Sequence, residues 1–328
     1  MNLTCPVPIN EAQRIVAVRS YEILDSEPEL EFDALARVAS QTFSAPIAVV
    51  AMMDSNRLWF KSKIGLEIPE LDRKIAFCAH TIIDPSEPLV VNDLQYDNRF
   101  AQNPLVANAP HLRFYAGAPL VDSNGMALGT VAVIDAQPRK FSDVQLRTLV
   151  DFSTLVMTAL QGRKRAIELK HFALTDYLTG IANRAQFDLA NSAEMSHFIR
   201  TGFVYSILCM DLNGFKSVND NYGHGAGDLV LCEVARRLNL QVRGGDLLAR
   251  LGGDEFAVVA RNCDYKAAQA LAQRFIEALH QPIVISSIIS VQVGISCGIR
   301  TVTPGDNSAA ALLERADEAL YKAKNQTI

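Results

Sequence analysis

Hydrophobic residues along the first half of the chain follow two different spacings. In residues 31–43 apolar positions recur every three or four residues, which predicts an amphipathic helix. Short apolar runs of strand length follow at residues 47–53, 58–64, 89–91, 114–120 and 127–134. The turn sequence Asp122-Ser123-Asn124-Gly125 separates the last two runs and predicts a hairpin. This order predicts an α+β domain with an antiparallel sheet sandwich over residues 20–160, after an N-terminal extension of residues 1–19.

A long helix is predicted to leave this first domain from about residue 142. Residues 142–174 contain no proline, and Leu149, Phe152, Val156 and Leu160 fall three or four positions apart. One interpretation is a single solvated helix, with residues 161–174 as a linker. The other is a two-stranded coiled coil that runs out of a dimer of the first domain. We favour the coiled coil, because the chemistry inferred below requires two chains.

Residues 175–328 predict a second α+β domain. An apolar strand over residues 203–210 ends at Asp211, and helical seams lie on both sides of a hairpin at residues 247–260. A strand at residues 289–299 and a helix at residues 308–324 complete the order β-α-β-β-α-β. That order predicts a ferredoxin-like, palm-type layer of helices on an antiparallel sheet.

The predicted hairpin carries acidic side chains at its tip. Gly252-Gly253 lies between two apolar runs, so a tight turn is expected, and Asp254 and Glu255 follow it directly. In the predicted topology Asp211 lies beside this turn, and two converging carboxylates suit Mg²⁺, a hard cation that prefers oxygen ligands. Residues 212–228 combine glycines, a lysine and a helix start, which suits an anionic phosphate group.

The composition argues against several classes of protein. A net charge of −5 over 328 residues does not fit a nucleic-acid-binding face, which would be basic. Serines and a glutamine interrupt the most apolar window, residues 282–299, so no membrane span is expected. The six cysteines form no CxxC pair, and the N-terminus lacks the pattern of a secretory signal. We therefore expect a cytoplasmic protein with free thiols.

The stretch from Arg250 to Phe256 resembles the signature of GGDEF domains, the diguanylate cyclase family. Residues 174–184 resemble that family's Asp-x-Leu-Thr-Gly-Leu-x-Asn-Arg motif, with Ile181 as a mild departure, and residues 211–228 resemble its second motif. The resemblance implies condensation of two GTP molecules into cyclic di-GMP with loss of two pyrophosphates. Because one domain holds one GTP, it also implies a homodimer, formed here through the first domain and the connecting helix.

The same resemblance implies roles for individual residues. It implies a Mg²⁺ ion, or Mn²⁺ in its place, held by Asp211, the Leu212 carbonyl and Asp254. The implied substrate contacts are Phe215, Asn219, Asp228 and Lys324, with Asn219 and Asp228 reading the guanine edge. Lys216 would offset triphosphate charge in the transition state. Asp254 ranks first and Glu255 second as the base that takes the 3′-hydroxyl proton.

Arg243 and Asp246 lie just before the hairpin, at the spacing of the family's product-inhibition motif, Arg-x-x-Asp. An arginine fork can bind guanine or phosphate, and the carboxylate can pair with the purine edge. The resemblance implies that cyclic di-GMP inhibits the enzyme here, with Arg274 as a second arm. The alternative is a surface ion pair.

Residues 77–82, 114–120 and 128–135 resemble GAF domains, a family of small-molecule sensor modules. The resemblance implies a sensor or dimerisation role and leaves the ligand unknown. Cys78 and His80 would suit a thioether-linked tetrapyrrole or a metal, but Ala79 separates them and no further ligands are nearby in the sequence. We favour a structural role for both side chains.

The C-terminal sequence departs from the GGDEF pattern. The family usually continues after Ala-Lys with Gly-Arg-Asn, whose arginine touches phosphate, whereas Lys324 here is followed by Asn325-Gln326-Thr327-Ile328. Substrate affinity is then reduced, or the chain has been cut short. This departure supports an alternative function, a weak or inactive domain that binds GTP or cyclic di-GMP as a receptor. A second alternative is a cyclase acting within one GTP, whose product would be 3′,5′-cyclic GMP.

Overall fold

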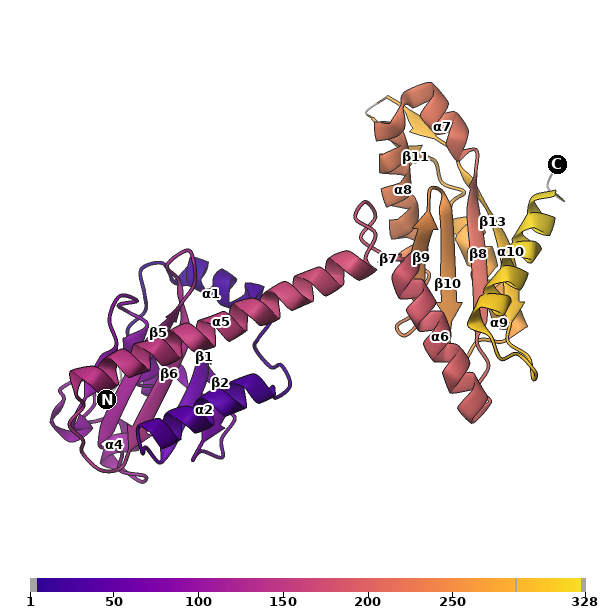
Figure 1. Ribbon diagram of the computed structural model, residues 1–328. Helices are drawn as coiled ribbons and strands as arrows, with labels where there is room; N and C mark the ends of the chain where they lie inside the picture. The colour runs from indigo at the N-terminus through magenta and orange to yellow at the C-terminus, as the bar shows by residue number, and fades with distance from the viewer. Residues whose placement is uncertain (1–4, 287, 326–328) are drawn as a thin grey trace. The chain divides into compact units, whose positions relative to one another are not determined.

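The computed structural model describes residues 5–286 and 288–325, and the chain divides into two compact units, Met1–Ile167 and Glu168–Ile328. Each unit has its own β-sheet with helices packed against it (Figure 1). The helix α5 (Asp143–Leu174) begins in the first unit and ends in the second. The predicted fold class, two α+β domains joined by a long helix, is confirmed.

The first unit is built on a six-stranded antiparallel sheet in the order β3-β2-β1-β6-β5-β4. Its strands are β1 (Ile47–Met53), β2 (Arg57–Ile64), β3 (Glu70–Asp72), β4 (Leu89–Val91), β5 (Phe114–Val121) and β6 (Ala127–Asp135). Its shorter helices are α1 (Glu11–Ser20), α2 (Leu30–Thr42), α3 (Cys78–Thr81) and α4 (Pro104–Ala107), with 3₁₀ turns at Arg73–Ile75 and Leu94–Tyr96. The strand positions predicted from the apolar runs are confirmed to within a residue or two.

Both faces of this sheet are buried, because successive residues of a strand point to opposite sides. Val50 of β1 belongs to the core that α2 and α5 cover, together with Phe32 and Phe152. Its neighbour Val49 belongs to the opposite core, with Phe77 beside α3. The strands are therefore apolar on both faces, which explains why they appear in the sequence as unbroken hydrophobic runs.

Helix α5 uses its apolar seam inside the first unit. Leu149, Phe152, Val156 and Leu160 are all buried in the core shared with α2. These four side chains contact their own sheet, so they do not form a coiled-coil seam between two chains as we expected. Other apolar residues of α5 are exposed, and Leu155 is 53% exposed.

A buried ionic cluster connects β2, the start of α2 and helix α5. Lys61 Nζ lies 2.7 Å from Glu29 Oε1, and Arg163 Nε lies 2.8 Å from the same oxygen. The β1–β2 register skips Lys61, since Val50 pairs with Ser62 and Ala51 with Phe60. Such a bulge changes the direction of local side chains, and here both Lys61 and Ser62 reach hydrogen-bond partners next to or in α2.

The second unit contains a five-stranded sheet in the order β13-β8-β10-β9-β7. Its strands are β7 (Ala182–Asn183), β8 (Ser206–Asn213), β9 (Leu247–Gly252), β10 (Glu255–Ala260) and β13 (Gly294–Thr301), with a separate pair β11 (Ile283–Val284) and β12 (Ser290–Val291). Its helices are α6 (Arg184–Thr201), α7 (Phe215–Tyr222), α8 (His224–Asn239), α9 (Tyr265–Ala278) and α10 (Ala309–Asn325). The four strands β13-β8-β10-β9 are antiparallel neighbours, as the βαββαβ order predicts.

Helices cover both faces of this second sheet. The residues Leu208, Met210 and Phe256 pack against α7, α8 and α9. The alternate residues Cys209 and Ala257 pack toward α6 and α10. Asp211 follows the Cys209 side of this alternation, which places it on the face that α10 covers.

Three local predictions in this unit were wrong. The strand expected at residues 289–299 is split into β12 and β13. The strand β8 begins at Ser206, so Asp211 lies inside the strand, and Phe203 is 61% exposed. The helix that follows the motif at residues 174–184 was expected to bury Phe187 and Leu189, but α6 buries Phe187 and Asn191, and Leu189, on the other side of the helix, is 61% exposed.

The described residues include no helix that is long and apolar enough to cross a lipid bilayer. The apolar window that begins at Pro282 instead contains the short strands β11 and β12 and the start of β13.

Candidate functional site

The Gly252-Gly253 turn joins β9 to β10, as predicted. The backbone φ is +154° at Gly252 and +53° at Gly253, a range in which glycine avoids the strain of a side chain. Arg250 holds the turn, because its Nε donates to the Gly253 carbonyl at 2.9 Å and its Nη1 lies 3.1 and 3.2 Å from the two Asp176 oxygens. The turn is therefore tied to the stretch that follows α5.

The strand register brings the end of β8 beside this turn. Asp211 on β8 is the direct partner of Glu255 on β10. Directly opposed residues of antiparallel strands project to the same side of the sheet, so these two carboxylates share one face. Asp254 lies in the turn itself, and its carbonyl accepts a hydrogen bond from the Leu212 N–H at 3.3 Å. Glu255, rather than Asp254, is thus the acid directly opposite Asp211.

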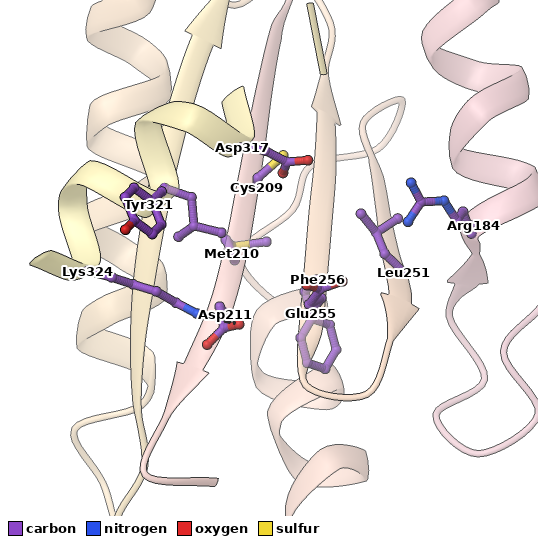
Figure 2. Close-up of a pocket in the computed structure, with 11 residues that line it drawn as sticks. Arg184, Cys209, Met210, Asp211, Leu251, Glu255, Phe256, Asp317, Tyr321 and Lys324 are labelled. Atoms are coloured by element: carbon purple, nitrogen blue, oxygen red, sulfur yellow. Dashed lines mark ion pairs between the residues drawn. The ribbon is translucent and has the colours of Figure 1, made fainter. Parts of the chain in front are cut away.

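A cavity of about 280 Å³ opens on this face, between the sheet and α10 (Figure 2). Its walls include Asp211, Glu255, Lys324 and Tyr321, with Arg184 from the start of α6. Lys324 Nζ lies 2.6 Å from Asp211 Oδ2, and the Asp211 side chain is 15% exposed. Figure 2 shows Lys324 reaching from α10 to the Asp211 carboxylate. The cavity therefore combines the carboxylates of Asp211, Glu255 and Asp317 with a cation that already contacts the first of them.

Cys209 lies at the floor of this cavity and is 1% exposed. Burial, with the negative charges of Asp317 and Glu255 nearby, raises the pKa of the Cys209 thiol far above its ordinary value. A neutral thiol is a poor nucleophile. The carboxylates and the cations therefore carry whatever chemistry this cavity performs.

A second polar site lies where α7 meets α8. The Asn219 Oδ1 atom is buried, and no described atom donates a hydrogen bond to it. Gly227 makes room for that side chain, since a Cβ at Gly227 would lie 2.0 Å from Asn219 Oδ1 and 3.2 Å from the Phe215 ring. A buried acceptor without a donor costs about 1–3 kcal/mol, which a ligand N–H could recover. Lys216 and Asp228, the adjacent polar residues, are exposed.

Arg243 and Asp246 pair with each other in the structure. Arg243 Nε lies 3.1 Å from Asp246 Oδ2, and its Nη2 donates to the Arg261 carbonyl. The other Asp246 oxygen accepts from the Arg261 N–H at 2.9 Å, and the Asp246 side chain is nearly buried. Arg274 donates to the Gln241 carbonyl at 3.2 Å. Arg243 and Arg274 are both exposed residues, so each could also contact an anion.

The oxygen donors present fit a hard divalent cation. Among the described residues no three His, Cys, Asp or Glu side chains converge on one point. The predicted ligand set, the Asp211 and Asp254 carboxylates with the Leu212 carbonyl, would need no third acidic side chain. Mg²⁺ commonly completes its coordination shell with water and phosphate oxygens. The ammonium of Lys324 on Asp211 shows that this carboxylate attracts a cation. The residues Gln326, Thr327 and Ile328, which depart from the expected Gly-Arg-Asn segment, lie outside the described residues.

Models of two protein families match the chain. The family described as "Diguanylate cyclase, GGDEF domain" matches residues 173–327. Residues 173–327 therefore form a GGDEF domain. A GAF domain precedes the GGDEF domain, since the GAF family model matches residues 27–160.

Relatives of this GGDEF protein carry several names. The cyclic di-GMP phosphodiesterase PA2567 of Pseudomonas aeruginosa is 27% identical over 297 residues, which is 89% of this chain and 49% of that protein. Diguanylate cyclase A of Treponema denticola is 30% identical over 191 residues, 56% of this chain and 50% of that protein. The chain thus spans about half of the length of these two curated relatives, and only a quarter of another, the bifunctional MucR of Pseudomonas aeruginosa.

One solved structure also resembles this chain. The coiled coil and GGDEF domain of DgcB from Caulobacter crescentus, solved in complex with c-di-GMP, is 27% identical with a TM-score of 0.51. The match covers 55% of this chain and 95% of that one. It supports the GGDEF fold of the second unit.

Sequence reasoning did not single out some residues that line the cavity. Asp317 and Tyr321 lie in the last helix, four positions apart and on the side of Lys324, and we had considered only Lys324 from that helix. Leu313 and Ala316 of the same helix are buried, and Asp317 and Tyr321 lie next to them on the helix surface. Helical spacing could therefore have indicated that these two residues face the sheet. Arg184 is the last residue of the motif at residues 174–184, to which the sequence analysis assigns no site residue.

Proposed function

We propose that this chain is a diguanylate cyclase that condenses two GTP molecules into cyclic di-GMP, with its GAF domain as the regulatory module. One observation carries the proposal. Asp211 and Glu255 face each other across β8 and β10, on the wall of a cavity that Lys324 also lines. Paired carboxylates beside a cation suit phosphoryl transfer, in which catalysis depends on positioning and on stabilising negative charge.

The metal site in this proposal consists of Asp211, the Leu212 carbonyl and Asp254. The Leu212 N–H already bonds to the Asp254 carbonyl, so these groups come from adjoining backbone. A bound Mg²⁺ or Mn²⁺ would neutralise triphosphate oxygens and make a nearby hydroxyl easier to deprotonate. Lys216, exposed at the start of α7, would offset further phosphate charge, and Lys324 would contact phosphate from α10.

We infer that Glu255 accepts the 3′-hydroxyl proton, although the sequence ranked Asp254 first. Glu255 lines the cavity opposite Asp211, whereas Asp254 lies in the turn and is absent from the cavity wall. A positioned base contributes roughly 10²–10⁴-fold to a rate. We expect Glu255→Gln to lower kcat by about that factor at any Mg²⁺ concentration, whereas the loss in Asp254→Asn should partly recover as Mg²⁺ rises. Recovery of both variants, or of neither, would reject this division of roles.

The guanine site in this proposal lies between α7 and α8. The unpartnered Asn219 Oδ1 would accept a hydrogen bond from a guanine N–H, and the exposed Asp228 carboxylate would accept another. The ring of Phe215, which is 8% exposed, forms the apolar floor beside Gly227. Two acceptors side by side favour guanine over adenine. Guanine presents two neighbouring donors, N1–H and N2–H₂, whereas adenine presents one donor, N6–H₂, beside the N1 acceptor.

Two further features complete the proposal. The reaction joins two GTP molecules, so two GGDEF domains must meet in a homodimer, and α5 connects this domain to the GAF domain that would control the meeting. Product would bind at Arg243 and Asp246, which requires the Arg243 guanidinium to leave or share its present contacts. In that case Arg243→Ala would relieve inhibition by cyclic di-GMP, and unchanged inhibition would remove this site from the proposal.

The decisive test is incubation of the chain with GTP and Mg²⁺, with pyrophosphate release and chromatography of the nucleotide as readouts. We expect cyclic di-GMP, a rate that rises more steeply than linearly with protein concentration, and loss of product in Asp211→Asn. Release of pyrophosphate with 3′,5′-cyclic GMP as product would indicate a cyclase acting within one GTP. Nucleotide binding without any pyrophosphate at high protein concentration would indicate the receptor alternative.

A further inference from the structure

The GAF domain contains a second cavity, far richer in hydrocarbon than the cavity beside Asp211. Its volume is about 240 Å³, and it lies on the β1–β2 side of the sheet, under α3, α4 and the loop after β2. The deepest walls are Val49, Leu58, Phe60, Phe77 and Ile134, all of them buried. The inner wall of the cavity is therefore formed by core residues of the domain, and its outer end opens to the surface beside the loop after β2.

We propose that this cavity is the binding site of an uncharged, largely apolar small molecule. Natural interiors are close-packed, and voids larger than a water molecule are few. The apolar walls that face this cavity lack contact partners on that side, which costs dispersion energy and, where the cavity opens, exposes hydrocarbon to water. A cavity lined by hydrocarbon stays dry and binds apolar molecules such as benzene. A ligand of that kind would restore the missing contacts.

The walls exclude ionic ligands. No lysine, arginine or histidine lines the cavity among the described residues, and Glu67, at the exposed rim, is the one charged residue there. A phosphate or carboxylate would lose its hydration without gaining a cation, which costs several kcal/mol or more. Nucleotides, including GTP and cyclic di-GMP, therefore do not fit this cavity. The ligand class separates it from the nucleotide sites of the GGDEF domain.

Cys78 is the main polar group of the inner wall. The thiol is 2% exposed and receives a hydrogen bond from the Tyr115 hydroxyl at 3.5 Å. Tyr115 in turn shares a 2.7 Å hydrogen bond with Thr81. Because burial raises the pKa of the Cys78 thiol, it stays protonated at neutral pH. Such a thiol is suited to a soft contact with a ligand and not to metal coordination or covalent attachment.

A small loop borders the outer end of the cavity. Gly65 has φ +75°, and a Cβ there would lie 2.1 Å from the Pro46 carbonyl, so only glycine permits this course of the chain. After this glycine, Leu66 and Ile68 turn back onto the cavity and line it. Ile68 is 45% exposed. The entrance therefore consists of the apolar Leu66 and Ile68 with the exposed Glu67 between them, an acid that repels anions but leaves a path for a neutral molecule.

The test uses the full chain and two probes of similar shape, neutral ethylbenzene and anionic phenylacetate. The protein has one tryptophan, Trp59 on β2, so tryptophan fluorescence follows unfolding of the GAF domain alone. A ligand that binds only the folded domain stabilises it by RT ln(1 + [L]/Kd), so above Kd the unfolding midpoint rises with the logarithm of the ligand concentration. We expect ethylbenzene to raise the midpoint with this logarithmic dependence and phenylacetate to leave it unchanged.

Variants that fill the cavity distinguish the site from general adsorption. Leu66→Phe and Leu105→Phe add ring atoms from half-buried positions on the wall, where the fold tolerates a larger side chain. We expect each to weaken ethylbenzene binding at least roughly tenfold, the scale of a changed methylene or more in an apolar pocket. Ile83→Phe is the matched control, since Ile83 is 41% exposed and does not line the cavity.

Three outcomes would overturn the proposal. They are no midpoint shift with ethylbenzene, an equal shift with phenylacetate, or a shift that persists in both filled variants. Loss of a cooperative transition in one filled variant leaves the other to decide, and the wild-type comparison of the two probes stands without either. None of these measurements depends on turnover of GTP, so the result is independent of the proposed cyclase activity.

Discussion

The buried cluster of Lys61, Glu29 and Arg163 offers the sharpest test of how the GAF domain is held together. The Lys61 side chain is 0% exposed, and the Glu29 carboxylate is its only anionic contact among the described residues. Glu29→Gln keeps the shape but leaves a buried ammonium with two neutral acceptors, Ser26 Oγ at 2.9 Å and the Glu27 carbonyl at 2.6 Å.

The expected loss of stability follows from that geometry. Removing one partner of a buried ion pair typically costs about 3–5 kcal/mol. The Glu29 side chain is 28% exposed, and Lys61 retains its neutral acceptors, so the lower end, about 3 kcal/mol, applies. Urea unfolding followed by Trp59 fluorescence measures this loss, and Glu31→Gln, an exposed carboxylate of α2, is the matched control.

A second variant separates charge burial from packing. Replacing a buried ion pair by apolar residues of similar volume is often neutral or stabilising. Glu29→Gln combined with Lys61→Met should therefore be more stable than Glu29→Gln alone by about 1.5 kcal/mol or more, a coupling that a double-mutant cycle measures. A loss in Glu29→Gln no larger than in Glu31→Gln, or a double variant no better than the single one, would refute the reasoning.

The same cluster predicts a pH dependence with a definite sign. Burial alone would raise the pKa of Glu29, but hydrogen bonds from Lys61 and Arg163 outweigh it and hold the pKa below its ordinary value. A carboxyl with a lowered folded pKa contributes full stability above its unfolded pKa and loses it as the pH falls. The gap between wild type and Glu29→Gln should therefore be widest near neutral pH and shrink as the pH falls below about 4.5.

Two other predictions concern the GGDEF domain. Gly227→Ala places a Cβ against Asn219 Oδ1, so it should weaken GTP binding roughly tenfold (about 1.4 kcal/mol) in equilibrium titrations. Gly225→Ala is the control, because Gly225 lies in the same helix with open space around it, and this variant should bind GTP as wild type does. Arg250→Met removes the bonds to Asp176 and to the hairpin turn, costs about 2 kcal/mol locally, and should speed amide hydrogen exchange at the turn. Burial raises the pKa of the Asp176 carboxyl, but hydrogen bonds from Thr179 and Arg250 outweigh burial and hold that pKa below its ordinary value. The effect of Arg250→Met should therefore fade in acid. Equal amide exchange rates in wild type and Arg250→Met would contradict this prediction.

Much of this fold could be predicted from the sequence because its strands are buried on both faces. Unbroken apolar runs such as residues 47–53 and 127–134 fit few structures other than a strand buried on both faces. They therefore predicted the main strands of the first sheet almost residue by residue. The Gly252-Gly253 turn was equally clear, since a hairpin of two apolar runs requires it. These are local signals, and each agrees with the tertiary structure.

The parts that were missed depend on contacts between distant residues. The seam of α5 could pack against another chain or against its own sheet, and periodicity alone does not distinguish the two. The convergence of Lys324 with Asp211 depends on the stacking of α10 over β8, which no spacing in the sequence reports. The apolar cavity was invisible for the same reason, because a void is a property of how several elements meet.

The ion pair between Lys324 and Asp211 also has a thermodynamic consequence for the order in which partners arrive. A divalent cation that takes Asp211 must first displace the ammonium, and a triphosphate is the natural acceptor for the lysine that is released. Each of the two partners should therefore strengthen the binding of the other, by the same factor in both directions. In calorimetric titrations this exchange would make the apparent affinity for the free ion low and the affinity for the ion–nucleotide complex high. Lys324→Met would bring these two affinities closer together.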